Sequence, residues 1–243
     1  MTATSRSEPL TFAPGAALTA AVALVLAGLL ALGTWQVQRL AWKTALIEER
    51  TQQLAAPPTA LPAQLGDPAD WDFRRVRAAG RFLPEDAQLM GVSTQGGRLG
   101  RQLLVPLELD GGRALLVDRG WIPEERALPL DPALLAPDGA VEVTGILRDR
   151  SAAEPGWFTP ANAPAERTWF WYDVPALSAA TGRELLPVVL EADAGPGEAP
   201  PIGGLTLVDL PNDHLQYAIT WYGLAAGLVA VYVAYGLRRG RTL

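Results

Sequence analysis

The segment NDHLQYAITWY, residues 212–222, passes from a polar turn into a long apolar run and holds the only histidine of the chain, His214. No Asp, Glu, Lys or Arg interrupts this run from Leu215 to Leu237. A helix rises about 1.5 Å per residue and about 20 apolar residues cross the core of a bilayer, so the run predicts a transmembrane helix at residues 214–237. His214 then lies where water meets lipid, and a titratable, metal-binding imidazole is costly there unless it has a function.

A second segment of membrane length lies near the N-terminus. The chain is free of charged residues from Leu10 to Gln38, and we expect a transmembrane helix at residues 14–37. The helix is expected to continue to about residue 55, because two prolines follow at positions 57 and 58. A cleaved signal peptide is the alternative, but the apolar run is longer than is typical of such a peptide and continues into an amphipathic segment.

Charges at the ends of the chain predict its orientation in the membrane. Three arginines follow the second span: Arg238, Arg239 and Arg241. By the positive-inside rule, the tail at residues 238–243 is cytoplasmic, and two spans place the tail at residues 1–13 on the same side. The domain at residues 56–213 is then extracytoplasmic. Arg39 and Lys43 oppose this orientation locally, but long domains cross the membrane largely regardless of charge.

Composition argues against several classes of function. The 243 residues carry 20 Lys+Arg and 26 Asp+Glu, a net charge of -6, and so lack the basic excess of a nucleic-acid binder. The chain has no cysteine, one histidine and two methionines, which excludes disulfides, thiolate metal sites and covalently attached haem of the c type. We find no catalytic triad, phosphate-binding loop or metal-spaced cluster, and therefore expect no enzymatic activity.

Between the two spans, the pattern changes to short strands separated by turn residues. Strands are predicted at residues 73–82, 87–93, 103–109, 113–118, 141–148, 168–174 and 187–191. Asp110-Gly111-Gly112 predicts a hairpin turn, because glycine adopts positive φ without penalty. A short helix is expected at residues 174–181, ended by Gly182. The fold class is thus an α+β membrane protein, with two transmembrane helices flanking one extracytoplasmic β-rich domain, either a sandwich or a barrel.

Three separated segments carry a resemblance to a known family. They read LGTWQVQRLAWK at residues 32–43, LVDRGWIP at residues 116–123 and NDHLQYAITWYGLA at residues 212–225. In this order, and with two spans around a β-rich domain, they resemble the Surfeit-locus (Surf-one or Shy-one) family of cytochrome c oxidase assembly proteins, here in a bacterial form. The resemblance covers the whole chain. Asp118 departs from it, because members of the family often carry Asn before Arg-Gly-Trp.

The resemblance implies a biogenesis factor for haem–copper oxidase that helps deliver or insert haem a into the catalytic subunit. It implies a multi-pass protein of the bacterial plasma membrane, with the catalytic subunit and haem a synthase as partners, and it puts the family's haem-ligating histidine at His214. The alternative is a membrane-anchored scaffold that stabilises the nascent oxidase subunit without binding haem. A third hypothesis, a sensor, is disfavoured because the short tails hold no output module.

The residues near the predicted boundary suit a haem site. On a helix, His214, Tyr217 and Trp221 lie on one face, where an imidazole can ligate haem iron and aromatic rings can flank the macrocycle. Arg39 and Lys43 leave the first span at the same boundary and are predicted to pair with the haem propionates. The structural alternative for His214 is a boundary residue that is hydrogen-bonded to lipid or backbone.

The remaining candidate residues have both a structural and a functional interpretation. Trp35, Gln36 and Trp42 either anchor the first span or face the haem or the oxidase subunit, with Gln36 and Arg39 forming a polar ridge. Arg119, Gly120 and Trp121 form either a glycine turn, with the indole packed under the barrel and the arginine in a buried ion pair, or a contact with a partner. Residues 169–172, Trp-Phe-Trp-Tyr, are expected to alternate across a strand, with two rings in the core and two in a docking patch.

Overall fold

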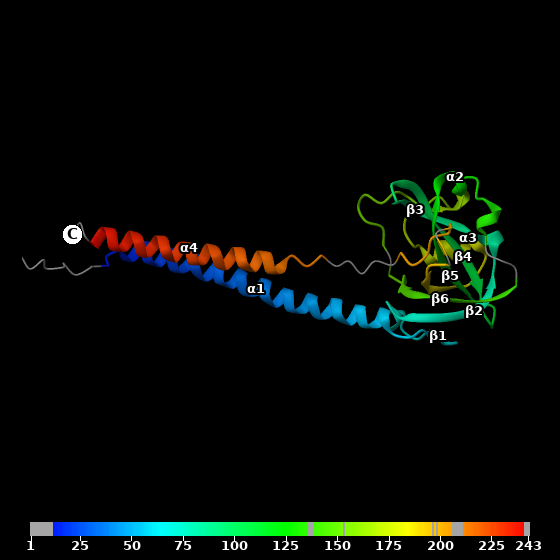
Figure 1. Cartoon of the computed structure of the whole chain (residues 1–243), viewed down its shortest axis with the longest axis horizontal. Helices are drawn as coiled ribbons and strands as arrows, with labels where there is room; N and C mark the ends of the chain where they lie inside the picture. The colour runs from blue at the N-terminus through cyan, green and yellow to red at the C-terminus, as the bar shows by residue number, and fades with distance from the viewer. Residues whose placement is uncertain are drawn as a thin grey trace, which may run out of the picture. The chain divides into compact units, whose positions relative to one another are not determined.

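The chain divides into two compact units, which we call the helical unit and the barrel unit (Figure 1). The helical unit comprises residues 1–49 with 209–243, and the barrel unit comprises residues 50–208. A computed structural model describes residues 12–135, 139–152, 154–195, 197, 199–205 and 211–240. The helices are α1 (Ala16–Ala55), α2 (Glu124–Ala127), α3 (Val174–Thr181) and α4 (His214–Gly240). The strands are β1 (Thr59–Ala60), β2 (Arg75–Phe82), β3 (Gln88–Gln95), β4 (Arg98–Glu108), β5 (Ala114–Pro123), β6 (Ala140–Asp149), β7 (Thr168–Trp169) and β8 (Leu185–Ala192).

Two long apolar helices therefore flank a β-rich domain in the sequence, as predicted. Both α1 and α4 are long and apolar enough to cross a membrane. Many of their apolar side chains are exposed, among them Leu24 (76%) and Val231 (69%). A helix that packs in the core of a soluble protein would instead bury one apolar face. Length, apolarity and exposure are thus those expected of membrane spans.

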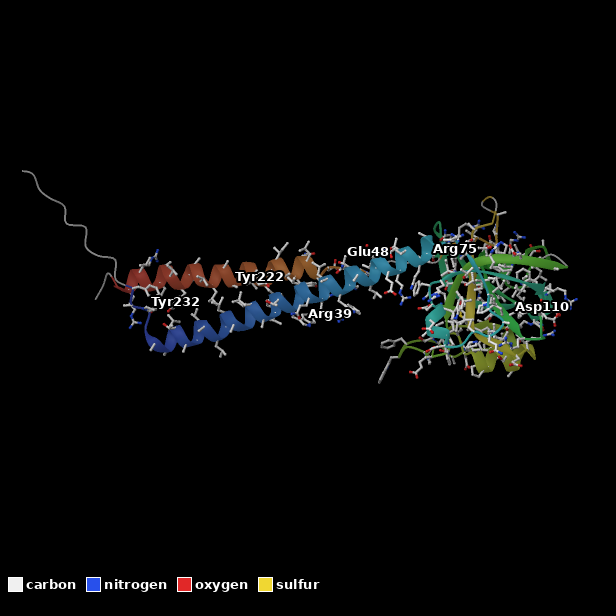
Figure 2. The ribbon with its side chains drawn as sticks, turned by 90° about the horizontal axis from the view of Figure 1, so that it is seen from below. Arg39, Glu48, Arg75, Asp110, Tyr222 and Tyr232 are labelled. Carbon is white, nitrogen blue, oxygen red and sulfur yellow. The ribbon has the colours of Figure 1, made fainter. Side chains whose placement is uncertain are left out.

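Within the helical unit, α1 and α4 lie side by side and run antiparallel (Figures 1 and 2). The hydroxyl of Thr19 lies 2.7 Å from that of Tyr232, and the hydroxyl of Thr34 lies 3.1 Å from that of Tyr222. Gly33 is buried, and a Cβ atom there would approach the Tyr222 ring to 2.9 Å. Small residues and hydrogen bonds between side chains are the usual means by which helices pack when lipid surrounds them.

In the barrel unit, five strands close into a barrel. An eight-stranded sheet has the order β1-β2-β6-β8-β5-β4-β3-β7, and an additional pairing of β2 with β4 joins its inner strands into a ring. Neighbouring strands of this ring are antiparallel, except β5 and β8, which are parallel. The sequence left a sandwich and a barrel open, and the β2–β4 pairing decides for a barrel.

The core has two parts because β5 is buried on both faces. Successive side chains of a strand point to opposite faces. Leu115 and Val117 accordingly belong to the larger hydrophobic cluster, whereas Leu116 packs in a second cluster with Trp169 and Leu177 of α3. A strand buried on both faces reads as a continuous apolar run, which explains the Ala-Leu-Leu-Val sequence that opens β5.

Local signals predicted several elements correctly. The hairpin at residues 110–112 is confirmed, with positive φ at Gly111 (94°) and Gly112 (84°) between β4 and β5. The helix α3 is also confirmed: the Asp173 side chain accepts a hydrogen bond from the amide of Ala176, and Gly182 ends the helix at φ 67°.

The prediction of a strand over residues 168–174 is wrong. β7 ends at Trp169, because the side chain of Asn162 accepts the backbone N–H groups of Phe170 (2.8 Å) and Trp171 (3.3 Å) in place of a strand partner. The expected alternation of residues 169–172 across a strand is therefore absent. Trp169 itself is fully buried and donates its indole N–H to Oε1 of Gln88 at 2.9 Å.

The segment LVDRGWIP, expected to end a strand in a turn, instead lies within β5. The strand continues through Gly120, which adopts φ 110° where a Cβ atom would collide with the backbone of Ile202. Only glycine accommodates both the positive φ and this close approach. The register of β5 against β4 shifts here, because Asp118 pairs with Leu104 and Trp121 with Gln102, so that residues 118–121 contain a β-bulge.

Candidate functional site

His214 is the first residue of α4, and its imidazole contacts α1. Its Nδ1 lies 2.7 Å from Oε1 of Gln36, a side chain of α1 that is only 8% exposed. The indole of Trp35 stands edge-on to the imidazole, with ring centroids 6.5 Å apart and planes at 80°. Three candidate residues thus meet across 178 positions of sequence, and Trp35 is still half exposed.

Two sets of candidate residues with the same spacing begin at the Gln36–His214 contact. They are Gln36, Arg39 and Lys43 on α1, and His214, Tyr217 and Trp221 on α4. Residues spaced i, i+3 and i+7 share one helix face. Because the helices are antiparallel, the two sets leave the contact in opposite directions, each reaching about 4.5 Å and then about 10.5 Å along its helix. The set on α1, with the cations Arg39 and Lys43, runs toward the C-terminal end of that helix. The set on α4, with the aromatic residues Tyr217 and Trp221, runs into the apolar part of that helix.

This site carries two cations, Arg39 and Lys43, on α1. Arg39 is exposed, and its guanidinium lies 4.4 Å from the ring centroid of Trp42, itself 53% exposed (Figure 2). Among the residues that the structure describes, neither Arg39 nor half-buried Lys43 forms an ion pair with an Asp or Glu. Within the described ranges, no carboxylate therefore competes with an anionic ligand for these two charges.

The aromatic residues on α4 occupy different environments. Tyr217 is 54% exposed and Trp221 is half-buried, and neither ring makes a described ring contact with His214. The packing role of Tyr222 was not predicted from the sequence: its ring fills the space next to Gly33 and its hydroxyl lies 3.1 Å from that of Thr34 on α1. A tyrosine opposite a glycine could have been suspected only with the helix pairing in hand.

Arg119, Gly120 and Trp121 lie in the barrel unit and make mainly structural contacts. Trp121 is 3% exposed, and its indole N–H points to the carbonyl of Ser93 at 3.4 Å. The predicted buried ion pair of Arg119 is not found within the described part of the chain, where its guanidinium donates to the carbonyl of Leu134 at 2.7 Å. Burial lowers the pKa of Arg119.

A buried carboxyl group was missed at Asp118. Its side chain is 9% exposed and accepts the N–H of Gly120 at 2.9 Å, so Asp satisfies the backbone at this point of β5. Burial raises the pKa of Asp118 to about 7, against the opposing effect of the Gly120 hydrogen bond. The carboxyl lines a cavity of about 220 Å³ with Tyr172 and Glu191. The only signal in the sequence was an Asp at the end of an apolar run.

No cluster of three metal-binding side chains (His, Asp or Glu) exists among the residues that the structure describes. The candidate donor to a metal is thus a single imidazole. A single protein ligand is sufficient only for a metal that brings its remaining donors, as the iron of a haem does.

The fold and site define a class of protein with a helix pair of membrane length, an imidazole at its end, and a five-stranded barrel between the two helices in sequence. A family model described as the SURF1 family matches residues 23–226, and the chain belongs to this family. It is 35% identical over 215 residues to a "SURF1-like protein" of Monosiga brevicollis, covering 83% of this chain and 81% of the relative. It is 33% identical over 222 residues to "Surfeit locus protein 1" of Takifugu rubripes (84% and 90% covered) and 34% identical over 214 residues to that of Homo sapiens (80% and 69% covered). The resemblance found in the sequence is thereby confirmed at the level of the family.

Proposed function

We propose that this chain is a membrane-anchored biogenesis factor for haem–copper cytochrome c oxidase, which holds haem a at His214 and helps deliver it to the catalytic subunit. The observation that carries the proposal is the contact of the His214 imidazole with Gln36 and Trp35, at the point from which two cations follow α1 and two aromatic residues follow α4. Membership of the SURF1 family supports the pathway.

The arrangement around His214 matches the chemistry of haem. Haem is a flat apolar ring with two carboxylates at one edge, and its iron accepts an imidazole nitrogen. Arg39 and Lys43 are suited to pair with the carboxylates on the polar side of the Gln36–His214 contact. Tyr217 and Trp221 are suited to contact the ring on the apolar side, and Trp35 next to the imidazole.

Holding and releasing haem requires no catalytic group in this chain. His214 supplies one bond to iron, and the surrounding side chains supply orientation and charge. A partner that offers more ligands or a closer-fitting pocket then takes the cargo by its higher affinity. The proposed partners are haem a synthase as the source and the oxidase catalytic subunit as the recipient.

The proposed location is a bacterial plasma membrane, crossed by α1 and α4, with the barrel unit on the outer side and both termini in the cytoplasm. The antiparallel pairing of the helices supports termini on one side of the bilayer. The arginines after α4 support a cytoplasmic side.

The test is the haem content of the full chain purified from cells that make haem a. His214→Ala is expected to lose most of the bound haem and the associated visible spectrum. Thr44→Val is the control, since it removes a hydrogen bond of 3.3 Å to Asn212 near the same end of α4 but leaves His214 intact. Equal haem content in His214→Ala and the unmodified chain would exclude His214 as the ligand.

A scaffold function is the second candidate, and one observation favours it. Trp157 and Phe158 are 95% and 93% exposed in the loop between β6 and β7 of the barrel unit. Adjacent exposed aromatic residues are typical of contacts with a protein partner. If Trp157→Ser with Phe158→Ser abolishes oxidase assembly and His214→Ala leaves it intact, the scaffold function is supported over haem delivery.

A further inference from the structure

The contact between Gln36 and His214 assigns different roles to the two nitrogens of the imidazole. The Oε1 atom of Gln36 has no hydrogen and can only accept a hydrogen bond. At 2.7 Å from Nδ1 it requires the proton on that nitrogen. In the neutral ring, Nε2 then carries the free electron pair.

We propose that Gln36 is the positioning residue of the site: it holds His214 in the Nδ1–H tautomer and aims Nε2 at the incoming metal. The inference rests on the proposed function for its purpose, but the tautomer itself is a property of the chain without haem. Histidines that bind metals in proteins usually donate their second N–H to a carboxylate or carbonyl, which sets the ring orientation and strengthens the ligand.

Burial makes this hydrogen bond effective. Gln36 is 8% exposed, so little water competes for its Oε1 atom, and it lies beside buried Gly33 on the face of α1 that contacts α4. An amide that simply anchored the span at the headgroups would instead be exposed to them. The Trp35 indole next to the ring further restricts rotation of the imidazole.

The contact also connects ligand strength to helix packing. Gln36 belongs to α1 and His214 to α4, so the acceptor is present only while the two helices are together. Separation of the helices at this end removes the acceptor, frees the ring to change tautomer and weakens Nε2 as a ligand. A partner that parts α1 from α4 would therefore promote release of the cargo.

The first test needs no haem, because the chain has one histidine and its ring signals are unambiguous. Nitrogen-15 NMR of the histidine-labelled chain in lipid nanodiscs, at a pH where the ring is neutral, is expected to show protonated Nδ1 and unprotonated Nε2. Gln36→Leu should shift the ring toward the Nε2–H tautomer, whereas Thr44→Val should leave it unchanged. An unchanged tautomer in Gln36→Leu would overturn the proposal.

The second test separates this inference from the proposed function. Gln36→Leu is expected to weaken haem binding by about 10- to 100-fold, the usual effect of removing such a partner. Gln36→Glu should retain haem and lower its reduction potential, because a carboxylate draws the Nδ1 proton more strongly. If both variants match the unmodified chain while His214→Ala loses haem, the positioning role fails and the haem site remains. If His214→Ala keeps haem, the proposed function fails, and the NMR result still decides the tautomer.

Discussion

Asp118 ends the apolar opening of β5 with a carboxyl group that the barrel holds away from water. Burial favours its neutral form and raises its pKa to about 7, assisted by the negative charge of Glu191. Arg150 and a hydrogen bond from Tyr172 oppose this shift. At the scale of a residue, the environment thus turns an ordinary acid into a group that titrates near neutrality.

The stability of the chain should therefore fall as the pH rises toward 7. A carboxyl with a raised pKa in the folded state stabilises that state while it is protonated, and the contribution disappears as pH rises from its unfolded value near 4 to its folded value. Between pH 5 and pH 7 the loss due to Asp118 is about 2–3 kcal/mol. Asp118→Asn keeps an oxygen for the Gly120 N–H and should abolish this part of the pH dependence.

Urea unfolding of the full chain in detergent at pH 5 and pH 8 measures this effect. Asp110→Asn, in the exposed hairpin turn (Figure 2), is the matched control and should behave as the unmodified chain does. If the free energy of unfolding of Asp118→Asn differs from that of the unmodified chain by the same amount at both pH values, the pH dependence does not come from Asp118.

At the scale of elements, α1 and α4 pack through a glycine and a tyrosine. A side chain at position 33 would enter the space that the Tyr222 ring occupies, whereas no atom lies within 4 Å of a Cβ at Gly28. Gly33→Val is therefore expected to separate the helices, and Gly28→Val is not, although both place a β-branched residue in the same helix.

Crosslinking with a short thiol-specific bis-maleimide can measure this separation, because the chain has no native cysteine. Thr19→Cys with Tyr232→Cys, at positions whose hydroxyls lie 2.7 Å apart in the unmodified chain, should crosslink efficiently, because the reagent bridges the gap that the shorter cysteine side chains leave. Gly33→Val should lower the yield several-fold. Equal yields in the Gly33 and Gly28 variants would show that this glycine does not determine the packing.

In the barrel unit, Asp72 joins the last turns of α1 to β6. Its carboxylate accepts hydrogen bonds from Arg50 (2.9 Å) and Arg148 (3.1 Å), and both guanidinium groups lie 3.9 Å from the ring centroid of Phe73. Asp72→Ala is expected to lower the free energy of unfolding by about 1–3 kcal/mol, since partly buried Arg50 loses this carboxylate and Arg148 keeps only its ion pair with Glu191. Asp70→Ala, which removes an exposed carboxylate two residues away, should change it by less than about 0.5 kcal/mol when both variants are compared by urea unfolding in detergent.

At the scale of the whole molecule, two spans predict that the hairpin of the barrel unit and the C-terminal tail lie on opposite sides of the membrane. In intact cells, a membrane-impermeant thiol reagent should label Asp110→Cys and not Thr242→Cys. Both cysteines should be labelled after the membrane is permeabilised. Labelling of only position 242 in intact cells would invert the proposed orientation, and labelling of both would contradict two spans.

Elements whose causes are local could be predicted from the amino-acid sequence. Two long apolar runs predicted α1 and α4, and Asp110-Gly111-Gly112 and Gly182 predicted a turn and a helix end. In these cases the cause lies in the residues themselves, because apolar side chains favour lipid and glycine adopts positive φ. Prediction from the sequence failed at Phe170 and Trp171, where a side chain eight or nine positions away takes the backbone hydrogen bonds. The tertiary structure alone decided that β2 closes on β4, that Asp118 is buried, and that Gln36 meets His214. Each of these depends on residues distant in sequence, whose free energy of interaction exists only once the chain has brought them together.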